Sequence, residues 1–162
     1  MIRATTNFDG RQLRAKGATF TKMSREDRAR VLIADDHQCF LDRVLKVLEG
    51  EFTVVGAVTS GAQLVFAAGA LEPDAVVIDV SMPDMTGLEA LDAIRARGLH
   101  TPAVFLTAWQ EAEIVEAAWH AGALGFVVKT AVASDLVPAL RAALQGQRFL
   151  SSSAVQPVSH SA

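Results

Sequence analysis

The chain alternates between two kinds of segment, and this alternation limits the possible fold more than any other feature of the sequence. Five short runs rich in Val, Ile, Leu and Ala are separated by segments with the 3.6-residue spacing of amphipathic helices. The apolar runs are Val31–Ala34, Thr53–Val58, Ala75–Val80, Ala103–Thr107 and Gly125–Val128. The helical segments are Cys39–Glu49, Gly61–Gly69, Gly87–Arg97, Glu111–His120 and Asp135–Gln145. Because strands that are apolar throughout are typical of a sheet covered on both faces, the pattern predicts an α/β fold with a doubly wound, five-stranded parallel sheet.

The residues outside this pattern predict two tails. Residues 1–29 are expected to be a flexible basic leader, since residues 1–30 carry eight Lys or Arg against three acidic residues. Met23 is a second candidate for the start of the protein. Residues 30–150 predict one domain, and residues 151–162 lack periodicity and predict a flexible tail. The basic residues of the leader are too scattered to predict nucleic-acid binding.

Cysteine content and hydropathy indicate the compartment. Cys39 is the only cysteine, so an internal disulfide is excluded and a reducing environment is favoured. We expect Cys39 to be a small buried residue. No apolar run approaches the roughly 20 residues that a membrane-spanning helix needs. These features predict a cytoplasmic protein without a membrane partner.

Reactive side chains lie at the ends of four predicted strands. Asp35 and Asp36 follow the first strand, Asp79 ends the third, Thr107 ends the fourth and Lys129 follows the fifth. The carboxyl ends of the strands form the functional crevice of doubly wound sheets, so these side chains are expected to converge. Three carboxylates together favour a hard divalent cation such as Mg²⁺. A carboxylate is also a nucleophile that can form an acyl phosphate, while a lysine and a hydroxyl balance the phosphoryl charge.

Four segments that contain these residues resemble one known family. They are VLIADDH, VVIDVSMPDMTGLEAL, VFLTA and AGALGFVVKT, and over about residues 30–150 they are similar to response-regulator receiver domains of two-component signalling. The resemblance implies a flavodoxin-like receiver fold that is not a conventional enzyme. It also implies a histidine kinase or a histidine phosphotransfer protein as the partner that donates the phosphoryl group.

The same resemblance assigns a role to each candidate site residue. Asp79 would be the phosphoacceptor, and Asp36, Asp79 and the backbone carbonyl of Ser81 would bind Mg²⁺, assisted by Asp35 through water. The other assignments are Thr107 as the switch hydroxyl, Lys129 as the partner of the phosphoryl group and Phe126 as the aromatic residue that changes rotamer on activation.

Three residues near the motifs need a separate interpretation. Thr130 stands where many members of the family have proline, so the loop that positions the lysine is expected to differ. Trp109 is a bulky residue two positions after Thr107 and is expected to shield an acyl phosphate from water. His37 lacks the Cys and His neighbours of a zinc site and is interpreted as local structure.

The sequence is also compared with three other classes of protein. A phosphatase of the haloacid-dehalogenase type would need a second carboxylate two residues after Asp79, where Ser81 stands. A docking domain that is never phosphorylated would not need the complete set of reactive residues. The start ADDH and the end ALQGQRFLSSSA resemble receivers that precede a helix-turn-helix domain, so the chain is either a receiver fragment of a DNA-binding regulator or a domain that acts alone.

The fourth helical segment predicts a surface for partners. Ile114, Ala117, Ala118 and Ala121 are expected to pack on the sheet. Val115 and Trp119 are expected on a second, exposed stripe that is bordered by Phe126. This stripe would bind a partner protein or a second copy of the chain.

Overall fold

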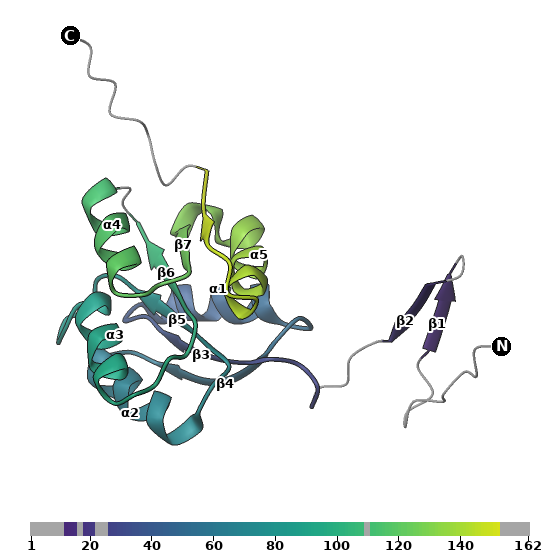
Figure 1. Cartoon of the computed structure of the whole chain (residues 1–162), viewed down its shortest axis with the longest axis horizontal. Coiled ribbons are helices and arrows are strands. Elements are labelled where there is room, and N and C mark those ends of the chain that lie inside the picture. Colours follow the sequence, from purple (N-terminus) through teal and green to yellow (C-terminus); the bar gives the residue numbers. More distant parts are fainter. Residues whose placement is uncertain (1–11, 16–17, 22–25, 109–110, 153–162) are drawn as a thin grey trace, which may run out of the picture.

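A parallel sheet forms the centre of the protein (Figure 1). The computed structural model describes residues 12–15, 18–21, 26–108 and 111–152. Six strands lie in the order β4-β3-β5-β6-β7-β8, and every neighbouring pair is parallel. The strands are β3 (Arg30–Ala34), β4 (Thr53–Val58), β5 (Ala75–Asp79), β6 (Ala103–Thr107), β7 (Gly125–Val128) and β8 (Phe149–Leu150).

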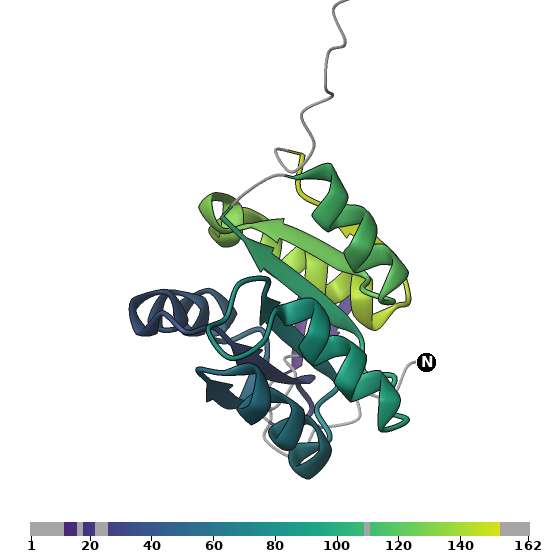
Figure 2. The ribbon, with the colours of Figure 1, turned by 90° about the vertical axis from the view of Figure 1, so that its left-hand side faces the viewer.

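Helices cover both faces of this sheet, which explains why its central strands are apolar throughout. The helices are α1 (Gln38–Leu48), α2 (Gly61–Leu71), α3 (Gly87–Ala96), α4 (Ala112–His120) and α5 (Val132–Leu144), with the 3-10 turn η1 (Lys129–Ala131) before α5. One buried cluster joins the sheet to α2, α3 and α4, and the other joins it to α1 and α5. Figure 2 shows the first of these faces, with its helices in front of the strands.

The predicted α/β fold is confirmed, with two additions. The sheet has a sixth strand, because the two residues of β8 pair with Gly125 and Phe126 of β7. A two-residue strand is too short to produce a recognisable pattern in the sequence. In the predicted leader, which was expected to be flexible, β1 (Gln12–Ala15) and β2 (Ala18–Thr21) form an antiparallel hairpin.

Local interactions fix the loop between β5 and α3. Thr86 caps α3 by accepting from the backbone N–H of Glu89, whose carboxylate accepts in return from the backbone N–H of Thr86. Gly87 lies so close to β5 that a Cβ atom there would be 2.3 Å from the carbonyl oxygen of Asp79. Only glycine permits this approach, so Gly87 holds the start of α3 against the end of β5.

The loop is also bound to the neighbouring helix. The carboxylate of Asp84 accepts from the backbone N–H groups of Gly61 and Ala62, both at 2.9 Å. These two groups lie at the N-terminus of α2, where backbone N–H groups lack helical partners and the helix dipole favours a negative charge. Both hydrogen bonds lower the pKa of Asp84.

The predicted exposed stripe on α4 is wrong for Val115. Val115 is buried with 5% of its surface exposed, and Phe126 is completely buried. Trp119 is half-buried, and the guanidinium of Arg148 lies 5.0 Å from its ring. The buried face of α4 is centred on Ala118. Val115 stands three residues before Ala118 and Ile114 four residues before it, so both lie on the same face of the helix as Ala118. Ala117, which was expected to pack on the sheet, is exposed.

The structure also differs from the predictions for Cys39 and for the start of the tail. Cys39 is exposed, because the buried residues of α1 are Leu41, Val44 and Leu48 and Cys39 faces away from them. Ser151, the first residue of the predicted tail, is buried and hydrogen-bonded. Trp109 lies outside the described residues, so its expected shielding role stays a prediction.

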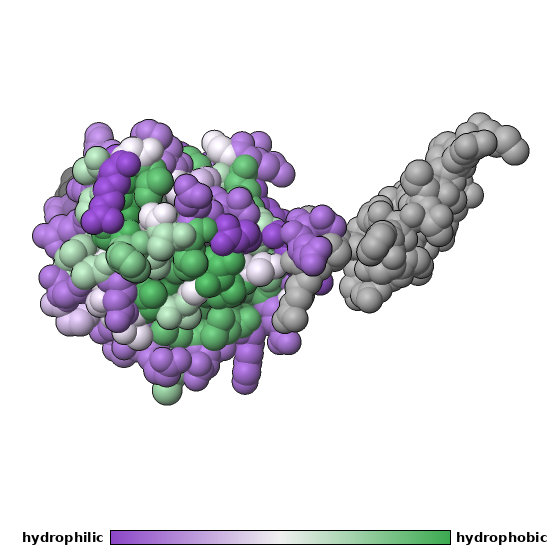
Figure 3. All heavy atoms as spheres, turned by 90° about the horizontal axis from the view of Figure 1, so that it is seen from below, coloured by the Kyte–Doolittle hydropathy of each residue, from purple (hydrophilic) through white to green (hydrophobic). Residues whose placement is uncertain are grey.

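One face of the molecule carries a broad apolar area that is bordered by polar residues (Figure 3). Figure 3 views the molecule from below Figure 1, on the side where α2 lies, and shows apolar surface among polar residues. Phe66 of α2 is the most exposed of the large hydrophobic residues described, at 72%. Among the described helices, none combines the length and the apolar character needed to cross a membrane.

Candidate functional site

Four neighbouring strands bring the predicted site residues together. The strands β3, β5, β6 and β7 are consecutive in the sheet and parallel, so their carboxyl ends lie along one edge. Asp35 follows β3, Asp79 ends β5, Thr107 ends β6 and Lys129 follows β7. The expected convergence at this edge is therefore observed.

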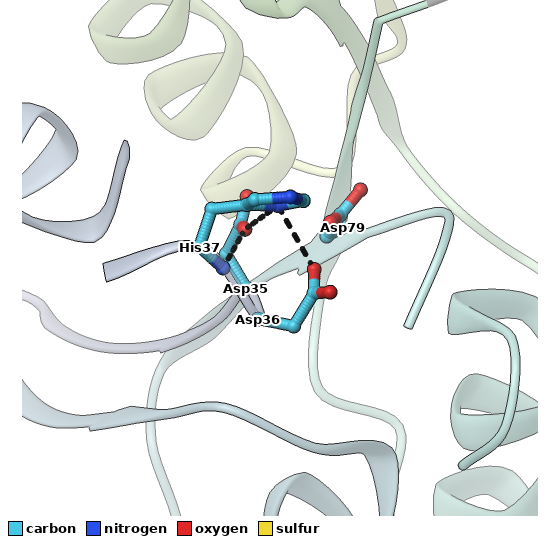
Figure 4. A group of neighbouring side chains, drawn as sticks. All are labelled: Asp35, Asp36, His37 and Asp79. Carbon is cyan, nitrogen blue, oxygen red and sulfur yellow. Dashed lines mark hydrogen bonds and ion pairs between the residues drawn. The ribbon is translucent and has the colours of Figure 1, made fainter. Parts of the chain in front are cut away.

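An acidic cluster occupies the part of this edge nearest to β3 and β5. Asp35, Asp36, His37 and Asp79 each offer a ligand atom, and these atoms all lie within 4.8 Å of one another. Figure 4 shows the carboxylates of Asp35 and Asp36 beside the ring of His37, with Asp79 across from them. Three carboxylates at this separation repel one another unless positive charge is close.

Asp35 is the most deeply buried member of the cluster. Its side chain is fully inaccessible, and its Oδ1 accepts from the backbone N–H of His37 at 2.8 Å. Its Oδ2 accepts from the ammonium group of Lys129 at 2.6 Å. Both oxygens of Asp35 therefore have partners within the protein.

Lys129 supplies positive charge to the cluster. Its Nζ lies 2.6 Å from Asp35 Oδ2 and 3.3 Å from Asp79 Oδ2, and only 16% of its side chain is exposed. The same ammonium lies 4.5 Å from the ring centre of Phe40 on α1, a favourable cation–π position. Lys129 opens the turn η1, so its loop leads directly into α5 with Thr130 as the second residue of the turn.

The electrostatics of Asp79 follow from its surroundings. Burial raises the pKa of its carboxyl from 3.8 to about 6, and the Asp35 carboxylate also raises it. Lys129 and the backbone N–H of Ser81, which donates to Asp79 Oδ1 at 3.2 Å, act in the opposite direction. Without a further cation, a substantial fraction of Asp79 is therefore protonated near pH 6.

Asp36 differs from its neighbour in having an unsatisfied oxygen. Its Oδ1 is buried and makes no hydrogen bond with any described residue, although His37 Nδ1 lies 3.1 Å away. A buried carboxylate oxygen without a partner is costly, and a divalent cation would remove that cost. Carboxylate oxygens that leave room for waters are the donors that Mg²⁺ prefers, so the residues present fit this ion.

Two predicted site residues lie at the edge of the cluster. Thr107 is 3% exposed at the end of β6, whose neighbour β5 ends in Asp79. Ser81 is exposed, and its backbone N–H contacts Asp79.

Sequence reasoning missed parts of the site. The ring of His37 is directed at both carboxylates of the aspartate pair, with Nδ1 3.3 Å from Asp35 Oδ1 and 3.1 Å from Asp36 Oδ1, as the dashed lines in Figure 4 show. Its backbone contact agrees with the predicted local role, but its ring belongs to the cluster. In the sequence, Phe40 is recognisable only as an apolar residue of a helical face. Its contact with Lys129, 89 positions away, is visible only in the structure.

Comparison with known proteins shows the family to which the chain belongs. A family model described as the response regulator receiver domain matches residues 31–141. The nitrate/nitrite response regulator protein NarL of Escherichia coli K12 is 35% identical over 138 residues, which are 84% of this chain and 63% of NarL. The transcriptional regulatory protein PdtaR of Mycobacterium tuberculosis H37Rv is 36% identical over 116 residues, which are 71% of this chain and 56% of PdtaR. The chain thus spans less than two thirds of the length of these curated relatives.

Solved structures agree as well. A two-component response regulator of the LuxR family from Aurantimonas sp. SI85-9A1 has a TM-score of 0.75 at 28% identity, over 78% of this chain and 92% of that one. The receiver domain of the putative response regulator NarL from Mycobacterium tuberculosis has a TM-score of 0.70 at 32% identity, over 74% and 98% of the two chains. The fold, the family model and these relatives lead to one conclusion: the chain belongs to the response regulator receiver domain family and is a receiver domain of two-component signalling.

Proposed function

We propose that this receiver domain accepts a phosphoryl group on Asp79 from a phosphohistidine of a histidine kinase or a histidine phosphotransfer protein. One observation carries the proposal: Asp79 ends the central strand β5 with 4% of its surface exposed, and the ammonium of Lys129 lies 3.3 Å from its Oδ2. A nucleophilic carboxylate beside a fixed cation is the arrangement that phosphoryl transfer needs.

The chemistry is a single displacement at phosphorus. A carboxylate oxygen of Asp79 forms the new bond to phosphorus, and the bond between phosphorus and the imidazole nitrogen of the donor breaks. The electron pair of that bond goes to the nitrogen, which takes a proton from water. Lys129 balances the charge on the phosphoryl oxygens, and the hydroxyl of Thr107, on the adjacent strand, donates to one of them.

The acidic cluster is proposed to hold Mg²⁺. Asp36, Asp79 and the backbone carbonyl of Ser81 are the proposed direct ligands. Asp35, whose side chain is fully buried and which accepts from Lys129 at 2.6 Å, acts through water. When bound, Mg²⁺ neutralises charge on the carboxylates and on the transferred group. The unsatisfied oxygen of Asp36 is the main support for this assignment.

The wider role is proposed from the relatives. Because the RcsB response regulator of Salmonella typhimurium, which is 28% identical, is described in connection with DNA interaction, we infer that the domain controls an output module that binds DNA, while the described domain itself contacts proteins only. Phosphorylation would alter a protein-binding surface, with a homodimer as one product and Phe126 as a residue that responds. The exposed, unpaired Cys39 supports a reducing, cytoplasmic setting.

Phosphotransfer from a labelled donor tests the proposal. A histidine phosphotransfer domain carrying ³²P on histidine is mixed with the wild type, Asp79→Asn or Asp84→Asn, with Mg²⁺ or with a chelator. We expect the wild type and Asp84→Asn to be labelled in the presence of Mg²⁺ and not in the presence of the chelator. Asp84→Asn is the control, because Asp84 lies in the same loop but its carboxylate is bonded to the N-terminus of α2. No transfer to Asp79→Asn is expected; equal labelling of this variant would refute the proposal.

A further inference from the structure

One buried polar side chain is left without a role in the site. The buried polar or charged residues among those described are Asp35, Asp79, Thr107 and Ser151. The first three belong to the site, whereas Ser151 follows β8 and is 1% exposed. A buried hydroxyl is costly unless it is hydrogen-bonded, so its partners indicate what it does.

The hydroxyl of Ser151 joins three segments of the chain. Its Oγ accepts from the backbone N–H of Val128 at 3.3 Å and donates to Asp135 Oδ2 at 2.6 Å. Its own backbone N–H donates to the carbonyl oxygen of Phe126 at 3.0 Å. The end of β7, the first turn of α5 and the residue after β8 are thereby held together.

The segment held in this way carries the lysine of the site. Val128 is the last residue of β7, and the next residue is Lys129, whose ammonium reaches Asp35 and Asp79. Because Val128 is itself only 2% exposed, water does not easily replace the hydroxyl as acceptor for its N–H. Loss of that acceptor would let the backbone just before Lys129 move.

We propose, on the basis of the function proposed above, that Ser151 is a positioning residue for Lys129. Through Val128 and Asp135 it fixes the backbone from which the lysine extends, and so sets the distance between the ammonium and the two carboxylates. The segment after β8 and the phosphorylation site are then linked. A movement that withdraws Ser151 releases the lysine, and any ligand that pulls the lysine strains the contact with Ser151.

Mg²⁺ affinity and phosphorylation rate together separate this role from general destabilisation. Lys129 neutralises the carboxylates to which Mg²⁺ would bind, so a displaced lysine raises Mg²⁺ affinity and slows phosphoryl transfer. A loosened fold would lower both. Calorimetric titration with Mg²⁺ alone and the rate of phosphorylation by acetyl phosphate are measured on the full chain.

The variants form a matched set. Ser151→Ala removes the contact, and Ser151→Cys keeps the side-chain volume in case the first variant does not fold. Ser134→Ala is the control, because the hydroxyl of Ser134 also bonds to Asp135 (2.9 Å) but its other bond is to Ala131, outside β7. Lys129→Ala and the double variant Ser151→Ala/Lys129→Ala show whether the serine acts through the lysine.

For Ser151→Ala we expect Mg²⁺ affinity to rise about threefold, and the phosphorylation rate to fall about tenfold. Ser134→Ala should match the wild type, and the double variant should have the Mg²⁺ affinity of Lys129→Ala. The inference is overturned if Ser151→Ala keeps the Mg²⁺ affinity and the phosphorylation rate of the wild type, or if both values fall. It is also overturned if the effects of Ser151→Ala and Lys129→Ala on Mg²⁺ affinity add in the double variant. If the wild type takes no phosphoryl group, the proposed function fails while the Mg²⁺ titration still tests the position of the lysine.

Discussion

The ammonium of Lys129 is bound to Asp35: its Nζ lies 2.6 Å from Asp35 Oδ2, a shorter distance than the 3.3 Å to Asp79 Oδ2. Both carboxylates are buried, so this lysine offsets part of the repulsion between them. In the proposed reaction, a metal ion competes with the lysine for the carboxylates, whereas a phosphoryl group on Asp79 attracts the lysine to its own oxygens. The lysine therefore links metal binding to phosphorylation.

Replacing this lysine should change two properties in opposite directions. Lys129→Ala removes a cation from the carboxylates, so Mg²⁺ affinity should rise about tenfold. The same change removes the charge that balances the phosphoryl oxygens, so phosphorylation by acetyl phosphate should slow about 100-fold. Lys46→Ala, an exposed lysine on α1, is the control and should change neither value. Weaker Mg²⁺ binding in Lys129→Ala would show that the lysine does not oppose the metal.

The two adjacent aspartates should differ in their effect on Mg²⁺. Asp36 has a buried oxygen without a hydrogen-bond partner, whereas both oxygens of Asp35 accept hydrogen bonds. Asp36→Asn should lower Mg²⁺ affinity by at least about tenfold, and Asp35→Asn should lower it less. Asp42→Asn, which changes an exposed carboxylate of α1, serves as the control for charge alone. Calorimetry that ranks Asp35→Asn above Asp36→Asn in its effect would reverse the assigned roles.

The raised pKa of Asp79 makes stability depend on pH. The folded protein binds the proton with a pKa of about 6, against 3.8 for an ordinary carboxyl, so between these values the folded state holds more protons than the unfolded state. The contribution of the protonated Asp79 carboxyl to the stability of the folded state is therefore complete below pH 3.8 and is lost as pH rises through about 6. In Asp79→Asn this loss is absent, so without metal at pH 7.5 the variant should be more stable than the wild type by roughly 1–3 kcal/mol.

Urea unfolding at several pH values, with a chelator present, measures this difference. The gap between the variant and the wild type should be widest above pH 7 and should shrink toward pH 4. Added Mg²⁺ should reduce it at neutral pH, because the ion stabilises the charged form of Asp79. A gap that stays constant with pH would mean that the pKa of Asp79 is not raised.

Two glycines in helices should respond oppositely to alanine. A Cβ at position 87 would lie 2.3 Å from the Asp79 carbonyl oxygen, so Gly87→Ala should lower the free energy of unfolding by about 1–3 kcal/mol. Position 69 of α2 has no atom within 4 Å of the added carbon, so Gly69→Ala should raise it by about 0.5–1 kcal/mol. Equal effects in urea unfolding would mean that the contact of α3 with β5 is not tight.

The fold and the centre of the site were predictable because they depend on strong local patterns. Fully apolar strands that alternate with amphipathic helices imply a covered parallel sheet, and a parallel sheet brings its carboxyl ends to one edge. Asp35, Asp79 and Lys129 stand at strand ends in the sequence, so their convergence follows from topology alone. The structure adds the pairing, with Lys129 closer to Asp35 than to Asp79.

What could not be predicted depends on contacts between distant segments. Ser151 stands in a run of three serines that looks like a tail, and its burial requires β8, a strand of two residues. On α4 the alanines allowed more than one choice of buried face, and the choice that exposed Val115 was wrong. A small residue such as alanine gives little preference for burial, so the contact with the sheet decides the orientation of such a helix.

Direct identification of the modified residue tests the central claim, which is that Asp79 carries the phosphoryl group. The protein is phosphorylated by acetyl phosphate with Mg²⁺ and then reduced with borohydride, which converts an aspartyl phosphate to homoserine, and its peptides are mapped by mass spectrometry. We predict homoserine at position 79 in the wild type, none in Asp79→Asn and none when a chelator replaces Mg²⁺. Homoserine at position 35 or 36 with unmodified Asp79 would contradict the assignment of the phosphoacceptor, and so would a phosphorylated protein in which no aspartate is reduced.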